Sequence, residues 1–272
     1  MSKDLAIHVE KVVKIFGDKT VLDHIDFDVH DGEAVCVLGG SGSGKSTLLR
    51  VMTGALKTDG GNVIIHGKSI CSMTDAELDE YRKSGIGVLF QSGALFNSMT
   101  VYDNVALPLR EHTNLEESTI DVVVKMKLEQ VGLREHADKM PAELSGGMKK
   151  RAGLARAMAM DPKVLFCDEP SAGLDPVTSA EIDELIVDLN KKLGITVVVI
   201  THEMDSARRI ADRMVLLDRG KFVASGTVEE MFASTDPLVN QFMHGTTHGP
   251  LTERRQRGEY VRDLLSEKKE NR

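Results

Sequence analysis

A short glycine-rich stretch constrains this chain more than any other feature. Residues 39–46 read GGSGSGKS, which fits the pattern G-x-x-x-x-G-K-S in full, between an apolar run and a helical one. Glycines let backbone N–H groups converge on a phosphate, Lys45 supplies a positive charge, and the Ser46 hydroxyl is a magnesium ligand. The stretch therefore predicts an α/β domain that binds a nucleoside triphosphate.

A second part of this site is expected where another apolar run ends. Asp168 and Glu169 follow VLFC, and we expect Asp168 to hold Mg²⁺ through water and Glu169 to act as the base toward an attacking water. His202 follows the next apolar run, and the carboxyl ends of parallel strands line one crevice, so His202 is expected to reach the γ-phosphate. The alternatives are a carboxylate pair that only caps a helix and a histidine without a role.

The order of the patterns predicts how the chain is organised. Early strand-like runs are separated by short turns such as Asp31–Gly32, which predicts antiparallel pairing, whereas later runs are continuously apolar and alternate with helices, as in a parallel sheet. Residues 92–160 are helical in pattern throughout. We expect a mixed sheet core with an antiparallel β subdomain and an inserted helical subdomain at about 92–160, all within residues 1–245.

The last segment, residues 246–272, is expected to be a charged C-terminal tail. Four apolar residues fall at the spacing i, i+1, i+4, i+5, which predicts a stripe on a short helix that docks on a neighbouring subunit: Tyr260, Val261, Leu264 and Leu265. A solvated chain end is the alternative.

Charge and composition exclude several classes of protein. A net charge of −8 argues against a nucleic-acid surface as the main partner. No apolar run approaches the ~18 residues of a membrane span, and the start of the chain does not read as a secretory signal. The three cysteines, Cys36, Cys71 and Cys167, are too widely spaced for a metal or redox motif, and a reducing cytoplasm is the expected compartment.

A second candidate anion site lies about a hundred residues after the first. Ser145, Gly146 and Gly147 precede a basic, alanine-rich helix, where a serine is a good N-cap and glycines leave N–H groups uncovered. One nucleotide needs one phosphate cradle, so we expect two chains arranged head to tail, each closing on the nucleotide of the other. An ordinary capped surface helix and an intramolecular use of the second site are the alternatives.

The motifs together resemble the ABC-transporter ATPase family. They occur in the family's order: GGSGSGKS at 39–46, LSGGM at 144–148, VLFCDE at 164–169, SAGLD at 171–175, and His202. The resemblance implies ATP and Mg²⁺ as cofactors and nucleotide contacts from a set of loop and helix-start residues: Gly39, Gly40, Ser41, Gly42, Ser43, Gly44, Lys45, Ser46, Thr47, Ser145, Gly146 and Gly147.

Three further roles are implied by this resemblance. Phe16 would stack on adenine, Gln91 would approach Mg²⁺ and the attacking water, and Asp175 would cross the interface of the dimer. A core phenylalanine and a surface amide are the alternatives for Phe16 and Gln91. The family signature usually ends in Gln, where this chain has Met148, so an altered contact is expected there rather than loss of activity.

One cassette in the chain favours a transport ATPase that pairs with a separate membrane permease. Apolar residues after Gln91 are candidates to line a groove for a permease helix, with insert core as the alternative: Leu95, Phe96, Val105, Leu107, Pro108 and Leu109. Stretches such as FQSGALF, DNVALPLREHT and QFMHGTTHGP resemble the ATPases of Mla-type phospholipid transporters.

That closer resemblance implies lipid traffic between the two membranes of a Gram-negative bacterium, which maintains the lipid asymmetry of the outer membrane. It places the chain at the cytoplasmic face of the inner membrane, bound to the permease, with a substrate-binding MCE-domain subunit and a small STAS-domain subunit as further partners. An ATPase of an amino-acid or lipoprotein transporter, or a non-transport ABC ATPase, remains the alternative.

Overall fold

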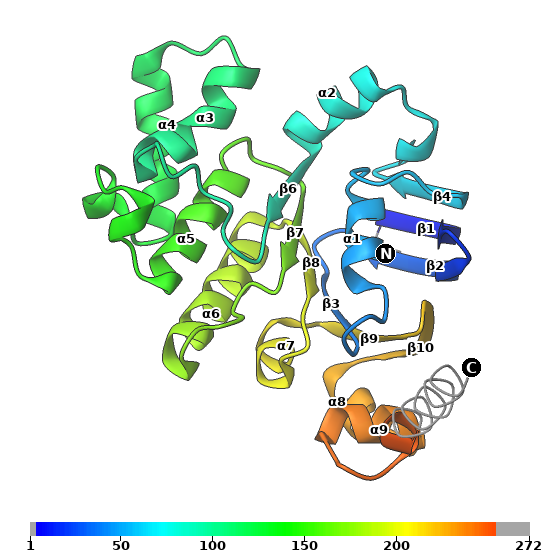
Figure 1. The fold of residues 1–272 in the computed structure, drawn as a ribbon. Helices are drawn as coiled ribbons and strands as arrows, with labels where there is room; N and C mark the ends of the chain where they lie inside the picture. Colours follow the sequence, from blue (N-terminus) through cyan, green and yellow to red (C-terminus); the bar gives the residue numbers. More distant parts are fainter. Residues whose placement is uncertain (1–3, 254–272) are drawn as a thin grey trace, which may run out of the picture.

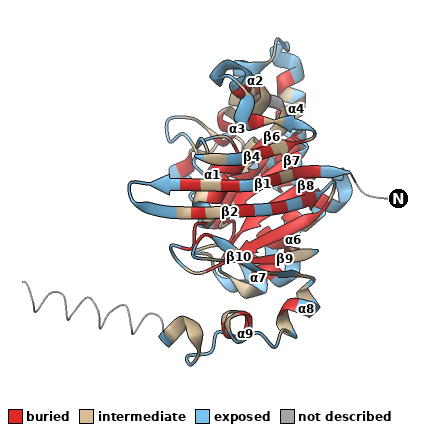
Figure 2. Cartoon of the chain, turned by 90° about the vertical axis from the view of Figure 1, so that its right-hand side faces the viewer, coloured by how far each residue is buried: buried red, intermediate tan, exposed pale blue. Residues whose placement is uncertain are grey.

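The computed structural model of the chain describes residues 4–253 (Figure 1). One sheet has four antiparallel strands in the order β2-β1-β4-β5: β1 (Leu5–Phe16), β2 (Lys19–His30), β4 (Gly60–Ile65) and β5 (Lys68–Ser69). Buried and exposed residues alternate along much of β1 and β2, so this sheet buries one face (Figure 2).

The second sheet has six strands in the order β10-β9-β3-β8-β7-β6. Their bounds are β3 (Ala34–Leu38), β6 (Ile86–Leu89), β7 (Val164–Asp168), β8 (Thr196–Ile200), β9 (Arg213–Asp218) and β10 (Lys221–Gly226). The strands from β9 to β6 pair in parallel. Every residue of β3 and β8 is buried, as expected for strands covered on both faces.

The edge strand β10 makes this sheet mixed, as expected for the core. It pairs antiparallel with β9. A two-residue turn joins the strands, and both of its residues, Arg219 and Gly220, have positive φ, of 47° and 76°. A turn with this backbone matches the twist of a hairpin, and a parallel crossover would need a much longer connection.

Helices surround the parallel sheet (Figure 1). Their bounds are α1 (Lys45–Met52), α2 (Asp75–Gly85), α3 (Val101–His112), α4 (Glu117–Gln130), α5 (Gly146–Ala157), α6 (Pro176–Leu193), α7 (Met204–Ile210), α8 (Val228–Phe232) and α9 (Pro237–His244). Three single turns of 3₁₀ helix lie at Ile70–Ser72, Arg134–His136 and Pro141–Glu143. None of the helices within residues 4–253 is both long enough and apolar enough to cross a bilayer.

Three apolar clusters hold the described part of the chain together. Along β3, Val35 and Val37 face the cluster shared with the antiparallel sheet and α1, while Ala34, Cys36 and Leu38 face the cluster shared with α6 and α7. This alternation follows from the two-residue period of a strand. A third cluster is formed mainly within α3, α4 and α5. The parallel sheet is therefore a rigid platform whose carboxyl edge can hold a site.

Candidate active site

A hollow of about 760 Å³ opens at the carboxyl edge of the parallel sheet. It brings together ten of the residues expected in the site: Gly39, Gly40, Ser41, Gly42, Lys45, Ser46, Gln91, Asp168, Glu169 and His202. They come from the loop after β3, the loop after β6, and the ends of β7 and β8. The common edge of parallel strands thus gathers residues that are up to 163 positions apart.

The loop between β3 and α1 has the geometry of a phosphate cradle. Its first glycine, Gly39, packs so closely that a Cβ there would lie 2.4 Å from the backbone oxygen of Leu217. Helix α1 begins without a side-chain cap, at Gly44 in a left-handed conformation. The N-terminus of α1 therefore has the free N–H groups and the positive end of the helix dipole that favour an anion.

The Lys45 ammonium lies on this loop. It donates to the carbonyl oxygens of Gly39, at 2.7 Å, and Gly40, at 3.2 Å. Partial burial lowers the pKa of Lys45, while the carboxylates of Glu169 and Asp168 act in the opposite direction. Two neutral carbonyl groups are weak partners for a half-buried cation, so phosphate oxygens would compete well for it.

Three of the expected nucleotide contacts lie beside the hollow rather than on its lining. Ser43, Gly44 and Thr47 belong to the same loop and helix start but are not among the residues that line the hollow. The buried hydroxyl of Ser43 has no hydrogen-bond partner among residues 4–253. An unpaired buried hydroxyl is costly, and a bound phosphate near the loop would be a natural partner for it.

The donors around Asp168 fit a magnesium ion. Burial raises the pKa of Asp168, and the neighbouring Glu169 carboxylate raises it further, so a nearby cation would favour the ionised form. Ser46 and Gln91, on the same hollow, add hydroxyl and amide oxygens. Residues 4–253 hold no cluster of three or more His, Cys, Asp or Glu that could bind a metal alone. Mg²⁺ typically combines one or two carboxylates with phosphate and water oxygens, which agrees with this sparse set.

Glu169 is held by the two residues that follow β8. Its carboxylate accepts from the Thr201 hydroxyl at 3.1 Å and contacts His202 Nδ1 at 2.8 Å. The Glu169 side chain is 12% exposed and that of His202 is 61% exposed. The carboxylate is thus fixed and partly dry at the rim of the hollow, where it can accept a proton from water.

The second candidate anion site lies at the start of α5, outside this hollow. The Ser145 hydroxyl accepts from the backbone N–H of Met148 at 3.3 Å, so it caps its own helix. A Cβ at Gly147 would lie 2.4 Å from Thr178 Cγ2, which shows that this glycine is required by packing on α6. Ser145 and Gly146 are exposed. Neither residue lines this chain's own hollow, and their role toward a nucleotide stays a prediction.

Phe16 and Asp175 also lie outside the residues that line the hollow. Phe16 ends β1, is 49% exposed, and has the Lys14 ammonium 5.4 Å from its ring centroid. Asp175 caps α6 by accepting from the N–H groups of Val177 and Thr178, each at 3.1 Å. Hydrogen bonding to Thr178 lowers the pKa of Asp175. Both roles assigned to these residues stay predictions.

Several residues of the site carried no signal in the sequence. Met204 and the end of α9 line the hollow, the latter through Phe242, Met243, His244 and Gly245. Nothing in the local pattern of α9 indicates a phosphate site, because its place beside the loop is set by packing on the second cluster. The predicted stripe of the tail, residues 260–265, lies outside the described residues.

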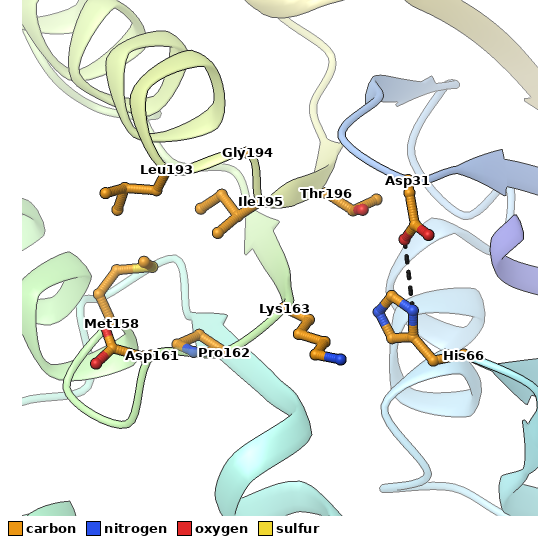
Figure 3. Close-up of a pocket in the computed structure, with 10 residues that line it drawn as sticks. All are labelled: Asp31, His66, Met158, Asp161, Pro162, Lys163, Leu193, Gly194, Ile195 and Thr196. Atoms are coloured by element: carbon orange, nitrogen blue, oxygen red, sulfur yellow. Dashed lines mark ion pairs between the residues drawn. The ribbon is translucent and has the colours of Figure 1, made fainter. Parts of the chain in front are cut away.

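A further hollow, of about 480 Å³, opens at the opposite edge of the parallel sheet (Figure 3). Lys163 precedes β7 and Gly194 precedes β8, so this hollow lies at the amino ends of the strands. His66 Nδ1 and an Asp31 carboxylate oxygen are 3.4 Å apart at its rim. It shares no lining residue with the phosphate loop, and the nucleotide chemistry belongs to the carboxyl edge.

A phosphate loop and a strand-end carboxylate pair on one edge of a parallel sheet define a P-loop nucleoside triphosphatase. The family model described as "ABC transporter" matches residues 22–172, more than half of the chain. The chain belongs to this family, and it is an ATP-binding, ATP-hydrolysing subunit of a transporter.

Individual relatives and one solved structure agree with this. A protein of Escherichia coli named "Intermembrane phospholipid transport system ATP-binding protein MlaF" is 44% identical over 249 residues, 92% of this chain and 92% of its own length. "Probable ribonucleotide transport ATP-binding protein mkl" of Mycobacterium leprae is 43% identical over 92% of this chain and 72% of its own length. A dimeric ATP-binding cassette solved in a post-hydrolysis state with ADP and phosphate has a TM-score of 0.76 and 30% identity, over 82% of this chain and 98% of its own.

Proposed function

We propose that this chain is the ATPase subunit of a transporter that moves phospholipids between two membranes. The relative named for intermembrane phospholipid transport matches over 92% of its own length, whereas the relative named for ribonucleotide transport matches over 72%. The match over nearly the whole length of both proteins favours the phospholipid assignment. Ribonucleotide transport is the second candidate, and it is supported by the similar identity of 43%.

The hollow at the carboxyl edge of the sheet carries the proposal of ATP hydrolysis. Lys45 binds the β- and γ-phosphates, and the N–H groups at the start of α1 orient them. Glu169 accepts the proton of the attacking water, and His202 and Thr201 hold its carboxylate in place. Ser46, Asp168 and Gln91 would hold Mg²⁺, which supplies positive charge to the phosphate oxygens.

A second copy of the chain completes the site in this proposal. Ser145 and Gly146 are exposed at the positive end of α5 and lie outside their own chain's hollow. In a head-to-tail dimer with two-fold symmetry, each α5 start faces the nucleotide of the partner. The solved relative with ADP and phosphate is a dimer, which supports this arrangement.

A membrane permease is the second partner that we propose. A groove of about 500 Å³ runs between α2, β6, α3 and α5, and it is lined by Asp79, Arg82, Lys83, Ile86, Gly87, Val88, Phe90, Pro108, His112, Arg156, Ala157 and Met160. Phe90 is 48% exposed there. An exposed aromatic beside arginines suits a short amphipathic helix.

Five of the six apolar residues named as candidates for a permease groove are absent from the lining of this one. Val105 and Leu109 are 0% and 3% exposed and belong to the core of α3, α4 and α5. Leu95 packs partly against that core, and Phe96 lies under the Arg156 guanidinium, 6.0 Å from its ring centroid. Pro108 does line the groove. An α-helix turns by about 100° per residue, so Val105 and Leu109, four positions apart, share the face of α3 that packs on the core, while Pro108 lies to one side of that face.

The remaining partners and the location follow from the same proposal. An MCE-domain subunit would supply the substrate, a STAS-domain subunit would bind the ATPase, and the complex would lie at the cytoplasmic face of the inner membrane. These statements depend on the resemblance to phospholipid transporters.

The test is reconstitution with the membrane subunits that co-purify with the tagged chain from detergent-solubilised membranes. In proteoliposomes, we expect labelled phospholipid to be transferred in the presence of ATP, and no transfer with the Glu169→Gln chain. Movement of a labelled ribonucleotide without lipid transfer would contradict the phospholipid assignment and favour the second candidate.

A further inference from the structure

Lys150 is a buried lysine that connects α5 to the end of β7. The residue is 5% exposed, and its ammonium donates to the backbone carbonyl of Glu169 at 2.8 Å. Burial lowers the pKa of Lys150, while Cys167 and the carboxylates of Glu169, Asp168 and Glu203 act in the opposite direction. A buried ammonium is costly unless it is hydrogen-bonded. Because Lys150 contacts the backbone of Glu169, the proposed base, we ask what Lys150 contributes to the active site.

The backbone that Lys150 contacts has an unusual conformation. Glu169 has φ of 48°, in the left-handed region that side chains other than glycine rarely adopt. Its N–H donates to the Ile200 carbonyl at 2.8 Å, and its own carbonyl also accepts from the N–H of Ala172 at 3.3 Å. Both ends of this residue are thus held, and the contact from α5 is the one charged contact to its carbonyl among those described for residues 4–253.

The same helix carries the second candidate anion site at its start. Ser145 caps α5, and Lys150 lies five positions further along, within the first two turns of the helix. If the start of α5 shifts and the helix moves as one piece, the shift would be passed on to the Lys150 ammonium. Glu169 and the start of α5 are therefore mechanically connected within one chain.

We propose that Lys150 is a positioning residue that couples the start of α5 to the catalytic base of the same chain. The inference rests on the proposed function, in which Ser145 serves the partner's nucleotide and Glu169 serves this chain's own. Under that assignment, closure of α5 on one nucleotide sets the carboxylate that hydrolyses the other. The contact thus links two ATP sites that share no phosphate.

Steady-state hydrolysis with Lys150→Met tests the positioning role. Methionine keeps much of the side-chain length but removes the donor, so we expect kcat to fall about tenfold or more, from the loss of a charge-assisted hydrogen bond. The KM for ATP should change less than about twofold, because the phosphate loop is untouched. Lys150→Arg restores a donor and should recover most of kcat.

The matched control is Lys127→Met. Lys127 is also a buried lysine of the helical region, at 6% exposed, but it pairs with Asp161 and has no contact with Glu169. Both methionine variants should lose stability to a similar degree in thermal unfolding. A fall of kcat in Lys150→Met and not in Lys127→Met would separate positioning from a general loss of stability.

Hydrogen exchange in the full-length chain adds a readout that does not depend on turnover. The amides of Glu169 and Ala172 are bonded to Ile200 and Glu169 carbonyls, so loosening of this segment should speed their exchange severalfold in Lys150→Met and not in Lys127→Met. Unchanged exchange and unchanged kcat would overturn the inference, as would a loss that Lys150→Arg does not restore.

Glu169→Gln separates failure of this inference from failure of the proposed function. If Glu169→Gln hydrolyses ATP normally, the assignment of the base is wrong. If Glu169→Gln is inactive but Lys150→Met is fully active, the base stands and only the coupling role of Lys150 is wrong.

Discussion

The starts of α1 and α5 are two anion sites of the same kind in very different surroundings. Helix α1 follows a glycine loop, has no side-chain cap, and faces Asp168 and Glu169 across the hollow. Helix α5 is capped by its own Ser145, and neither Ser145 nor Gly146 is among the residues that line that hollow. A free helix start next to carboxylates can do chemistry, whereas a capped and exposed start can only assist a site elsewhere.

Glycine has a different role in the two places. Gly39 permits the phosphate loop to pass close to β9, so the glycine shapes the cradle itself. Gly147 permits α5 to pack on Thr178, so this glycine fixes the helix against α6. Serine and glycine together can therefore form a phosphate loop, as before α1, or fix the position of an exposed helix start, as in α5.

The largest effect is expected at α1. Lys45→Ala removes the charge that draws the β- and γ-phosphates into the loop, and turnover should fall below about a tenth of wild type. ATP hydrolysis by the purified chain is the measurement. Lys57→Ala, whose side chain is 78% exposed and paired with Asp75, is the surface control. Retention of more activity in Lys45→Ala would mean that residues 39–46 are not the working phosphate site.

A mixture of two damaged chains tests whether the two helix starts serve different nucleotides. Ser145→Asp keeps a good helix cap but places a negative charge where the partner's phosphate is expected, and Ser145→Asn is the neutral control. Lys45→Ala and Ser145→Asp chains should each be inactive alone. Random mixing makes half of the dimers mixed, each with one intact site, so about a quarter of wild-type turnover should return if the sites act independently.

Strict coupling of the two sites would suppress that recovery, so ATP bound per mixed dimer should be counted as well. One intact nucleotide site per mixed dimer supports the shared arrangement. Binding at neither site would contradict it and would assign both helix starts to the same nucleotide.

The smallest effect is expected at Met148. Its side chain packs partly against the core of α3, α4 and α5, and its backbone N–H donates to Ser145. Met148→Gln restores the residue that usually ends the family signature, and it leaves that backbone bond in place. Turnover should change by less than about threefold, since the contact that sets the helix start is kept. A loss comparable to that of Lys45→Ala would show that α5 contributes through this side chain.

Local sequence patterns predicted the elements in which apolar residues or glycines follow a regular spacing. The phosphate loop and β7 and β8 were predicted because apolar runs and glycines are contiguous in the sequence. Strand β2 has a less regular pattern, since its buried residues Leu22, Ile25, Phe27 and Val29 lose the two-residue spacing at the start. His24, with φ of 53°, lies where the register with β1 shifts. A bulge of this kind is set by the pairing partner.

The tertiary contacts of the site could not be predicted in the same way. Lys150 reads as one more basic residue on a capped helix, and its contact with Glu169 depends on how α5 packs beside β7. The end of α9 reaches the hollow only through the folding of the C-terminal helices onto the second cluster. Contacts of this type join segments that are far apart in the sequence, and a local sequence pattern carries little information about them.

The left-handed backbone of Glu169 affects how the thermal stability of this protein can be raised. A conformation of this kind costs about 1–3 kcal/mol, which is a large share of the ~5–15 kcal/mol that keeps a domain folded. Glycine adopts the same backbone freely, so selection for heat resistance alone would favour Glu169→Gly and would discard the base. Robustness and turnover thus compete at a single position, and a thermostable laboratory variant of this ATPase should be checked there first.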